Sequence, residues 1–155
     1  MDKEGIKTLM KGTPLLYELD QKEIDLMGHY LEYRKEPEGS IIMKEGETGD
    51  SLFFIVSGEV EVSVQTPVDS EPLVAPIGKG DVVGEMAMMS SHNIRSATVT
   101  AISEIELLTL SKNNYETLVE KHNKIAFKIL KSITSNLCER IKRQSDQVVF
   151  LRLFG

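Results

Sequence analysis

Two charged residues with small neighbours are the clearest candidates for ligand binding. Glu85 follows Gly84 and opens an apolar stretch of good helix formers, and Arg95 with Ser96 leads into a predicted strand. A short helix beginning near Glu85 would present unpaired backbone N–H groups and a partial positive charge, which favour anions. Gly84 permits close approach or an unusual backbone angle. Arg95 can make a charge-assisted, bidentate contact to phosphate oxygens, and Ser96 adds a hydroxyl donor.

The carboxylate of Glu85 would repel a phosphate that it faced directly. It can instead accept a hydrogen bond from a sugar hydroxyl beside the phosphate, with Arg95 near enough to compensate its charge. A ribose cyclic 3′,5′-phosphate has one phosphodiester and one free hydroxyl, so these residue types match its polar groups. Two structural alternatives remain at this point. Arg95 could be a surface ion-pair partner, and Glu85 could be a charge favoured by the helix dipole.

The chain around this segment predicts a small antiparallel β structure. Short β-branched or aromatic runs are separated by turn signals, and residues 59–64 alternate strictly between polar and apolar. Such spacing suits a sandwich or jelly roll and not a parallel sheet with crossover helices. The glycines between the runs are interpreted as turn residues with a structural role: Gly46, Gly49, Gly58 and Gly80. The predicted strands are Ile41–Met43, Leu52–Val56, Val60–Val64, Leu73–Ile77, Ala97–Ile102 and Ile105–Leu110.

Helices are predicted on both sides of these strands. Asp20 with Glu23 forms a capping-box pattern before the strands, and Ser111 is a plausible N-cap after them. A longer helix follows, with one apolar stripe made of Ala126, Leu130, Ile133, Leu137 and Ile141. The predicted class is therefore α+β: an antiparallel β-roll or jelly roll flanked by an N-terminal helix and two C-terminal helices. We expect an N-terminal extension over 1–14, one domain over 15–143 and a C-terminal tail over 144–155, whose apolar density argues against free solvation.

Composition excludes several classes of function. The 155 residues suit one domain, with 41% hydrophobic and 27% charged residues. A formal net charge of −6 argues against a nucleic-acid surface covering the domain. Cys138 is the single cysteine and the three histidines are widely separated, so neither a disulfide nor a metal site is expected. The sequence contains no signal-peptide pattern and no apolar run long enough to span a membrane, which favours a cytoplasmic protein.

Three motifs in order resemble the cyclic nucleotide-binding domain family. Members of that family include the catabolite activator protein, regulatory subunits of protein kinase A and nucleotide-gated channels. The matching segments are the glycine-bounded turn at 44–50, the strand and turn at 52–60, and the phosphate-binding cassette at 84–87 with 95–98. Each segment alone is weak evidence, but all three in order are specific. Val83 and Ile94 depart mildly from the family pattern around the cassette.

The resemblance implies a role for each cassette residue. Glu85 would accept the ribose 2′-hydroxyl, and Arg95 would neutralise the cyclic phosphate. Ser96 and the backbone amides of Met86, Ala87 and Ser96 would complete the phosphate contacts, next to Gly84. In the family the last helix covers the base, and the candidates for that role here are Leu137, Arg140 and Ile141. An arginine could add a cation–π contact to the base.

These observations predict a regulatory domain that binds a cyclic nucleotide, cAMP in preference to cGMP, and signals by moving its C-terminal helix over the base. The alternative is a sensor fold of the transcription-factor family that has lost its DNA-binding domain and acts as a protein-interaction module without nucleotide. No enzymatic activity is expected, because hydrolysis of a cyclic phosphate normally needs a metal pair or an activated nucleophile. No cofactor is expected either.

The expected partners follow from the same interpretation. The apolar stripe of the last helix could be intradomain core or an interface between two subunits, and a homodimer is favoured. An unidentified downstream protein would detect the helix movement. Direct DNA binding is not expected, because the twelve residues after Arg143 are too few for a helix-turn-helix domain. No membrane partner is expected.

Overall fold

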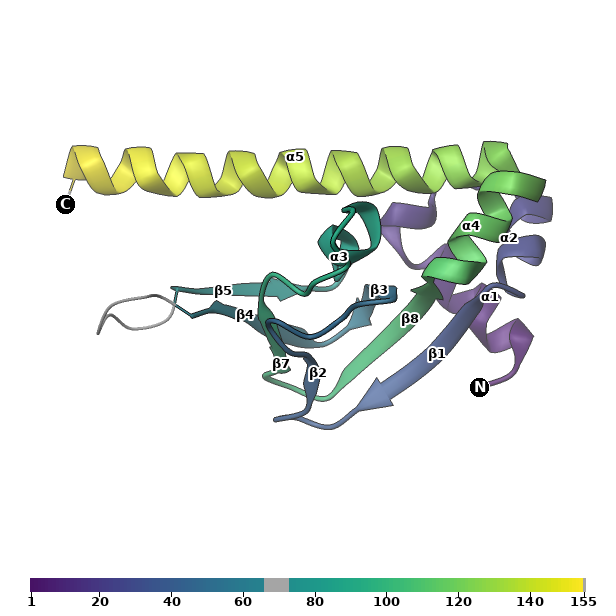
Figure 1. Ribbon diagram of the computed structural model, residues 1–155, viewed down its shortest axis with the longest axis horizontal. Helices are drawn as coiled ribbons and strands as arrows, with labels where there is room; N and C mark the ends of the chain where they lie inside the picture. The colour runs from purple at the N-terminus through teal and green to yellow at the C-terminus, as the bar shows by residue number, and fades with distance from the viewer. Residues whose placement is uncertain (66–72, 155) are drawn as a thin grey trace.

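The computed structural model describes residues 1–65 and 73–154 and has the predicted β-roll flanked by helices, with two helices after the roll as predicted and two helices and a 3₁₀ turn before it instead of one helix (Figure 1). Two four-stranded antiparallel sheets form the roll, in the orders β1-β8-β3-β6 and β2-β7-β4-β5. The strands are β1 (Leu31–Glu36), β2 (Ile41–Met43), β3 (Ser51–Ser57), β4 (Glu59–Val64), β5 (Leu73–Gly78), β6 (Val82–Val83), β7 (Thr98–Ala101) and β8 (Ile105–Ser111).

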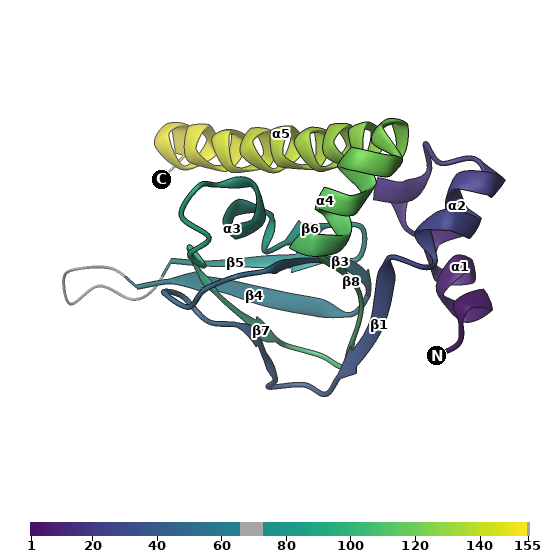
Figure 2. The same cartoon turned by 45° about the vertical axis from the view of Figure 1, so that its right-hand side comes forward.

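The helices gather on one side and one end of the roll. Figure 2 shows how α4 leads from the end of β8 up to α5, which lies across the molecule above α3. The Asp20 capping box is present, and the side chain of Ser111 accepts a hydrogen bond from the backbone N–H of Asn114. The helices are α1 (Lys3–Lys11), a 3₁₀ helix (Pro14–Leu16), α2 (Gln21–Met27), α3 (Glu85–Met89), α4 (Lys112–Lys121) and α5 (Asn123–Phe154).

Strand β3 separates two hydrophobic clusters. Successive side chains of a strand point to opposite faces of the sheet, and the neighbouring Phe53 and Phe54 consequently enter different clusters. Phe53 belongs to the cluster between the two sheets, together with residues such as Val99 and Leu107. Phe54 belongs to the cluster under the helices, with residues such as Ile129. Both rings are buried, so β3 connects the interior of the roll to the helical layer.

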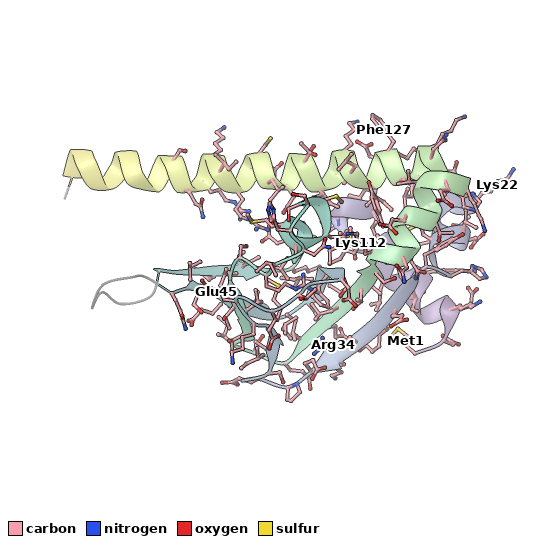
Figure 3. All side chains as sticks on the ribbon, viewed as in Figure 1. Met1, Lys22, Arg34, Glu45, Lys112 and Phe127 are labelled. Atoms are coloured by element: carbon pink, nitrogen blue, oxygen red, sulfur yellow. The ribbon has the colours of Figure 1, made fainter. Side chains whose placement is uncertain are left out.

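The predicted apolar stripe of the last helix is partly wrong. Ala126 and Ile133 are buried, but Leu130 and Ile141 point away from the core, and Ile141 is 63% exposed. At 3.6 residues per turn, Ile129 lies between Ala126 and Ile133 on the buried face, so Leu130 turns outward. The other side of α5 carries a second apolar group, which includes the outward-pointing Phe127, 66% exposed (Figure 3).

The chain ends are helical on both sides of the expected domain. Ile6 and Met10 of α1 are buried in the helical cluster, although they precede residue 15. The backbone of residues 144–154 continues α5. The expectation that the apolar side chains of this tail are not freely solvated concerns side chains outside the described ones. None of the described helices is long and apolar enough to cross a membrane.

Candidate functional site

The candidate site is built around Gly84 and the short helix α3. Gly84 has a φ of 82°, in the left-handed region, and is the N-cap of the helix that begins at Glu85. A Cβ atom at position 84 would lie 2.5 Å from Nη1 of Arg95 and 3.0 Å from the carbonyl oxygen of Ser51. Glycine is therefore required both by the backbone angle and by the close approach of Arg95.

Arg95 is held against the backbone and is only 6% exposed. Its Nη1 donates to the carbonyl oxygens of Ser51 at 2.7 Å and Gly84 at 3.0 Å. Burial lowers the pKa of Arg95, opposed by the nearby carboxylates of Asp50, Glu85 and Glu47. A guanidinium group has five N–H donors, and these two bonds use two, which leaves three without a hydrogen-bond acceptor within the described part of the chain.

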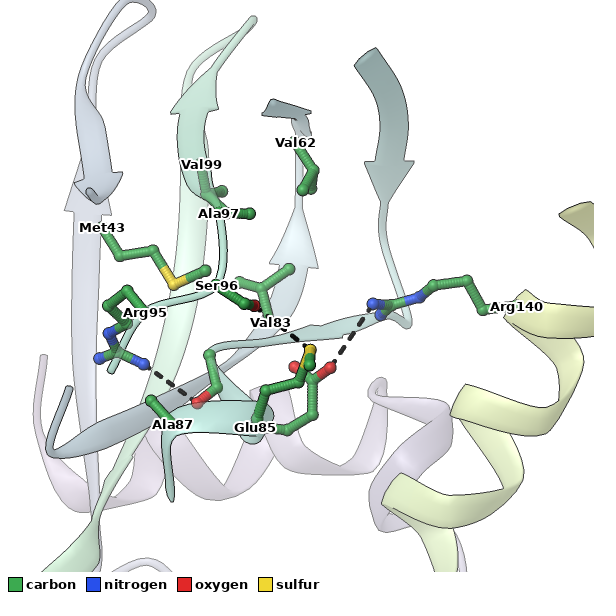
Figure 4. Close-up of a pocket in the computed structure, with 12 residues that line it drawn as sticks. Met43, Val62, Val83, Glu85, Ala87, Arg95, Ser96, Ala97, Val99 and Arg140 are labelled. Carbon is green, nitrogen blue, oxygen red and sulfur yellow. Dashed lines mark hydrogen bonds and ion pairs between the residues drawn. The ribbon is translucent and has the colours of Figure 1, made fainter. Parts of the chain in front are cut away.

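Glu85 is also buried, and its nearest cation is Arg140. Nη1 of Arg140 lies 3.7 Å from Oε1 of Glu85. Burial raises the pKa of the Glu85 carboxyl, while Arg140 and, more weakly, Arg95 oppose that change. The sequence led us to expect Arg95 as the compensating charge. Arg140 is the closer compensating charge because Arg95 is directed toward two backbone carbonyls and α5 passes over α3 (Figure 4).

These residues line one cavity of about 380 Å³, its open mouth included. All six predicted cassette residues line it: Gly84, Glu85, Met86, Ala87, Arg95 and Ser96. Sequence reasoning missed the apolar wall opposite them, which is formed by residues of β2, β4, β6 and β7 together with the residue before β7: Met43, Val62, Val83, Ala97 and Val99.

The three residues of the last helix that were predicted to cover the base lie in different environments. Arg140 lines the cavity, whereas Leu137 packs against the helical cluster and Ile141 points outward. Ser96 is exposed at the cavity and its Oγ donates to Sδ of Met86 at 3.2 Å. The cavity therefore has polar groups at the α3 and α5 ends and hydrocarbon elsewhere.

Hydrogen bonds connect α5 to the segment before the cassette. Arg140 donates through Nη2 to the carbonyl oxygen of Val82 and to Oδ1 of Asn136, the latter at 3.3 Å. Asn136 donates to Asp81 at 2.9 Å, and Arg143 contacts the same carboxylate oxygen at 3.1 Å. Residues 136–143 of α5 are thereby attached to residues 81–85, which contain one end of the cavity.

Comparison with known proteins agrees with this geometry. Residues 33–122 match the family described as cyclic nucleotide-binding domain, and the chain belongs to that family. It is 31% identical over 130 residues to the "Cyclic AMP receptor protein" of Thermus thermophilus, covering 84% of this chain and 60% of that protein. It is 32% identical over 110 residues to a "cAMP-dependent protein kinase regulatory subunit" of Yarrowia lipolytica, covering 71% of this chain and 28% of that subunit. The chain thus spans less than two thirds of either relative.

Solved structures share the fold. A cyclic nucleotide-binding domain from Methylobacillus flagellatus superposes with a TM-score of 0.81 at 25% identity, covering 95% of this chain and 82% of that one. The catabolite activator protein of Thermus thermophilus superposes with a TM-score of 0.71 at 26% identity, covering 90% of this chain and 63% of that one. The β-roll flanked by terminal helices is therefore the architecture of this family.

Proposed function

We propose that the chain is a regulatory domain that binds a cyclic nucleotide, cAMP in preference to cGMP, and does not alter it chemically. One observation carries the proposal: Glu85 and Arg95, with nine residues between them, line the same cavity although neither contacts the other. A phosphodiester needs a hydrogen-bond donor and its neighbouring hydroxyl needs an acceptor, and the two protein groups must be separated in this way. The relatives named for cyclic AMP support the choice of ligand.

Each cassette residue has a role in this proposal. The three uncommitted N–H groups of Arg95 bind the cyclic phosphate, and Ser96 with the first amides of α3, from Met86 and Ala87, donates to the same oxygens. Glu85 accepts the 2′-hydroxyl of the ribose. The apolar wall contacts the base and sugar faces, because hydrocarbon there leaves no unsatisfied polar group.

The C-terminal helix is the output of the domain. In this proposal α5 shifts over the base when ligand binds, and Arg140 connects the two events because it contacts both Glu85 and the backbone of β6. Ligand binding can change the free-energy difference between the two helix positions only by the difference between its binding free energies for them. Arg140 is therefore proposed to act at the ribose end of the cavity. It could contact the base only after α5 has moved.

Titration calorimetry with cAMP, cGMP and 5′-AMP tests the proposal directly. We expect binding of cAMP and weak or no binding of 5′-AMP, which has two charges and an open phosphate. Arg95→Ala should lower the affinity for cAMP by at least about 100-fold, because loss of even two of its charge-assisted hydrogen bonds to the phosphate has that effect. Glu85→Ala should abolish discrimination against 2′-deoxy-cAMP. Wild-type affinity in both variants would refute the site, and conversion of cAMP to AMP would refute the absence of chemistry.

A second copy of the chain is the proposed partner of the outer face of α5. Phe127, Leu130 and Ile141 are exposed at positions separated by three and eleven residues, the spacing of a two-helix interface. The helix has 32 residues, which gives a length of about 48 Å, and its C-terminal part extends beyond α3 (Figure 1). Sedimentation should show a dimer that Phe127→Ser weakens and that Val119→Ser, an exposed apolar residue of α4, leaves intact. A monomeric wild-type protein would contradict this dimer assignment but would not contradict the proposed nucleotide binding.

A further inference from the structure

The ring of Phe53 lies beside the guanidinium group of Arg95. Cζ of Arg95 is 5.5 Å from the centroid of the ring, within the range of a cation–π contact. A second guanidinium group, from Arg34, lies 5.9 Å from the same centroid. The ring is 4% exposed and does not line the cavity. Phe53 therefore touches the arginine of the site without being placed to touch a ligand.

Gly49 borders the same side chain from the loop between β2 and β3. A Cβ atom there would overlap three atoms of Arg95, with Cζ at 2.5 Å and Cδ at 2.7 Å. The backbone angle gives no reason for glycine, because Gly49 is absent from the residues with positive φ, which include Gly46, Gly58 and Gly80. Those three have the positive φ that turn glycines often adopt, whereas Gly49 is a loop residue without it. Its missing side chain provides the space that Arg95 occupies.

The loop that contains Gly49 is fixed to the end of the cassette by backbone hydrogen bonds. The N–H of Gly49 donates to the carbonyl oxygen of Asn93 at 2.7 Å, and the N–H of Arg95 donates to that of Glu47 at 2.8 Å. The loop therefore cannot move away from Arg95 without breaking these bonds. An added methyl group at position 49 would displace the arginine and not the loop.

We infer that Phe53 and Gly49 are positioning residues that hold Arg95 ready for the phosphate before any ligand arrives. This inference rests on the proposed function of Arg95. Ordering a flexible side chain during binding weakens affinity, whereas a side chain already held in place avoids that loss. The ring of Phe53 packs beside the guanidinium group, and Gly49 leaves room for it. Because two carbonyl oxygens hold Nη1 of Arg95, its remaining N–H donors have a fixed orientation.

Phe53→Leu tests the ring, with Phe54→Leu as its matched control. The two phenylalanines are neighbours on β3 and both are buried, but Phe54 faces the helical cluster, away from Arg95. Both variants should lower the urea midpoint. Phe53→Leu should also weaken cAMP binding, measured by calorimetry, by about two- to twelvefold, the loss that corresponds to ordering one long side chain at binding. Phe54→Leu should bind with wild-type affinity. Equal affinities in the two variants would overturn the inference.

Gly49→Ala tests the space around Arg95, with Gly46→Ala as its control. Gly46 lies in the same loop with a φ of 83° and no atom near its Cβ position. Its N–H donates to the backbone carbonyl of Arg95, a bond that Arg95→Ala keeps, so the Gly46 variant strains the loop without touching the Arg95 side chain. In urea unfolding without ligand, Gly49→Ala should lower the midpoint in the wild-type background and not in Arg95→Ala, whereas Gly46→Ala should lower it equally in both. Equal effects of Gly49→Ala in both backgrounds would overturn the role of Gly49.

The two measurements separate this inference from the proposed function. If the wild-type protein binds no cyclic nucleotide, the proposed function fails, and the unfolding experiment alone decides whether Gly49 acts on Arg95. If the wild-type protein binds cAMP and Gly49→Ala binds it equally well, the proposed function stands and the positioning role is wrong. Weaker binding in Gly49→Ala, together with background-dependent unfolding, supports both.

Discussion

Replacing Arg140 with methionine is expected to destabilise the ligand-free protein by about 2 kcal/mol. Its side chain is 20% exposed and donates to the carbonyl oxygen of Val82 and to Asn136. A hydrogen bond from a charged group contributes about 1.5–3 kcal/mol, and the second bond, at 3.3 Å, is long and adds little. Loss of the ion pair at 3.7 Å leaves Glu85 buried without its nearest cation, and uptake of a proton by Glu85, whose pKa burial raises, limits that cost. The Val82 bond therefore supplies most of the estimate.

Urea unfolding followed by circular dichroism measures this change, since the chain has no tryptophan to report by fluorescence. With a slope near 2 kcal/mol per molar urea, the midpoint should fall by roughly 1 M. Arg143→Met is the control: its side chain is 60% exposed and contacts Asp81, so a change below about 1 kcal/mol is expected. Equal midpoints for Arg140→Met and the wild-type protein would refute the attachment of α5 through Arg140.

Three further substitutions test particular groups by urea unfolding. Burial raises the pKa of Glu85 in the folded protein. The stability that Glu85 contributes is therefore fully present below its unfolded-state pKa and is lost as the pH rises through its folded-state pKa. The variant Glu85→Gln should not show this loss of stability. Hydrogen bonds lower the pKa of Glu106, so its contribution is lost as pH falls through the folded-state pKa, and Glu106→Gln should lack that acid-side loss. Gly58→Ala should cost more than Gly39→Ala: both have positive φ, but a Cβ at position 58 overlaps the carbonyl oxygen of Glu104, whereas position 39 is open.

The cassette could be predicted because its geometry is encoded locally. Gly84, Glu85 and the apolar residues after them specify a left-handed residue followed by a short helix, and the structure has that helix at Glu85–Met89. Strands with strong alternation or β-branched runs were predicted for the same reason. Strand β1 was missed because its sequence, LEYRKE, is mostly charged, and β6 was missed because two residues carry no periodicity.

The partners of the two site residues depend on tertiary structure and could not be predicted. Arg140 stands beside Glu85 because α5 crosses over α3, and 55 positions of sequence contain no sign of that crossing. The same limit explains Gly49, which looks like a turn glycine in sequence and becomes distinctive when Arg95 is seen against it. The stripe of the last helix was misassigned because both faces of α5 carry apolar residues. Spacing alone cannot say which face meets the core.

The charges of the cavity explain how one ligand could be sensed by a helix on the far side of the site. Two arginines and one glutamate give the cavity a formal charge of +1, and a cyclic phosphodiester carries one negative charge, so the occupied cavity would be neutral. The phosphate and the 2′-hydroxyl meet different residues: Arg95 is fixed to β3 and the cassette, whereas Glu85 faces Arg140 of α5. In the proposed function, phosphate binding alone would therefore leave α5 where it is. In that proposal, a hydroxyl that bonds to Glu85 would compete with Arg140 for the carboxylate, so the sugar, and not the charge, would be the part of the ligand that favours one position of the helix.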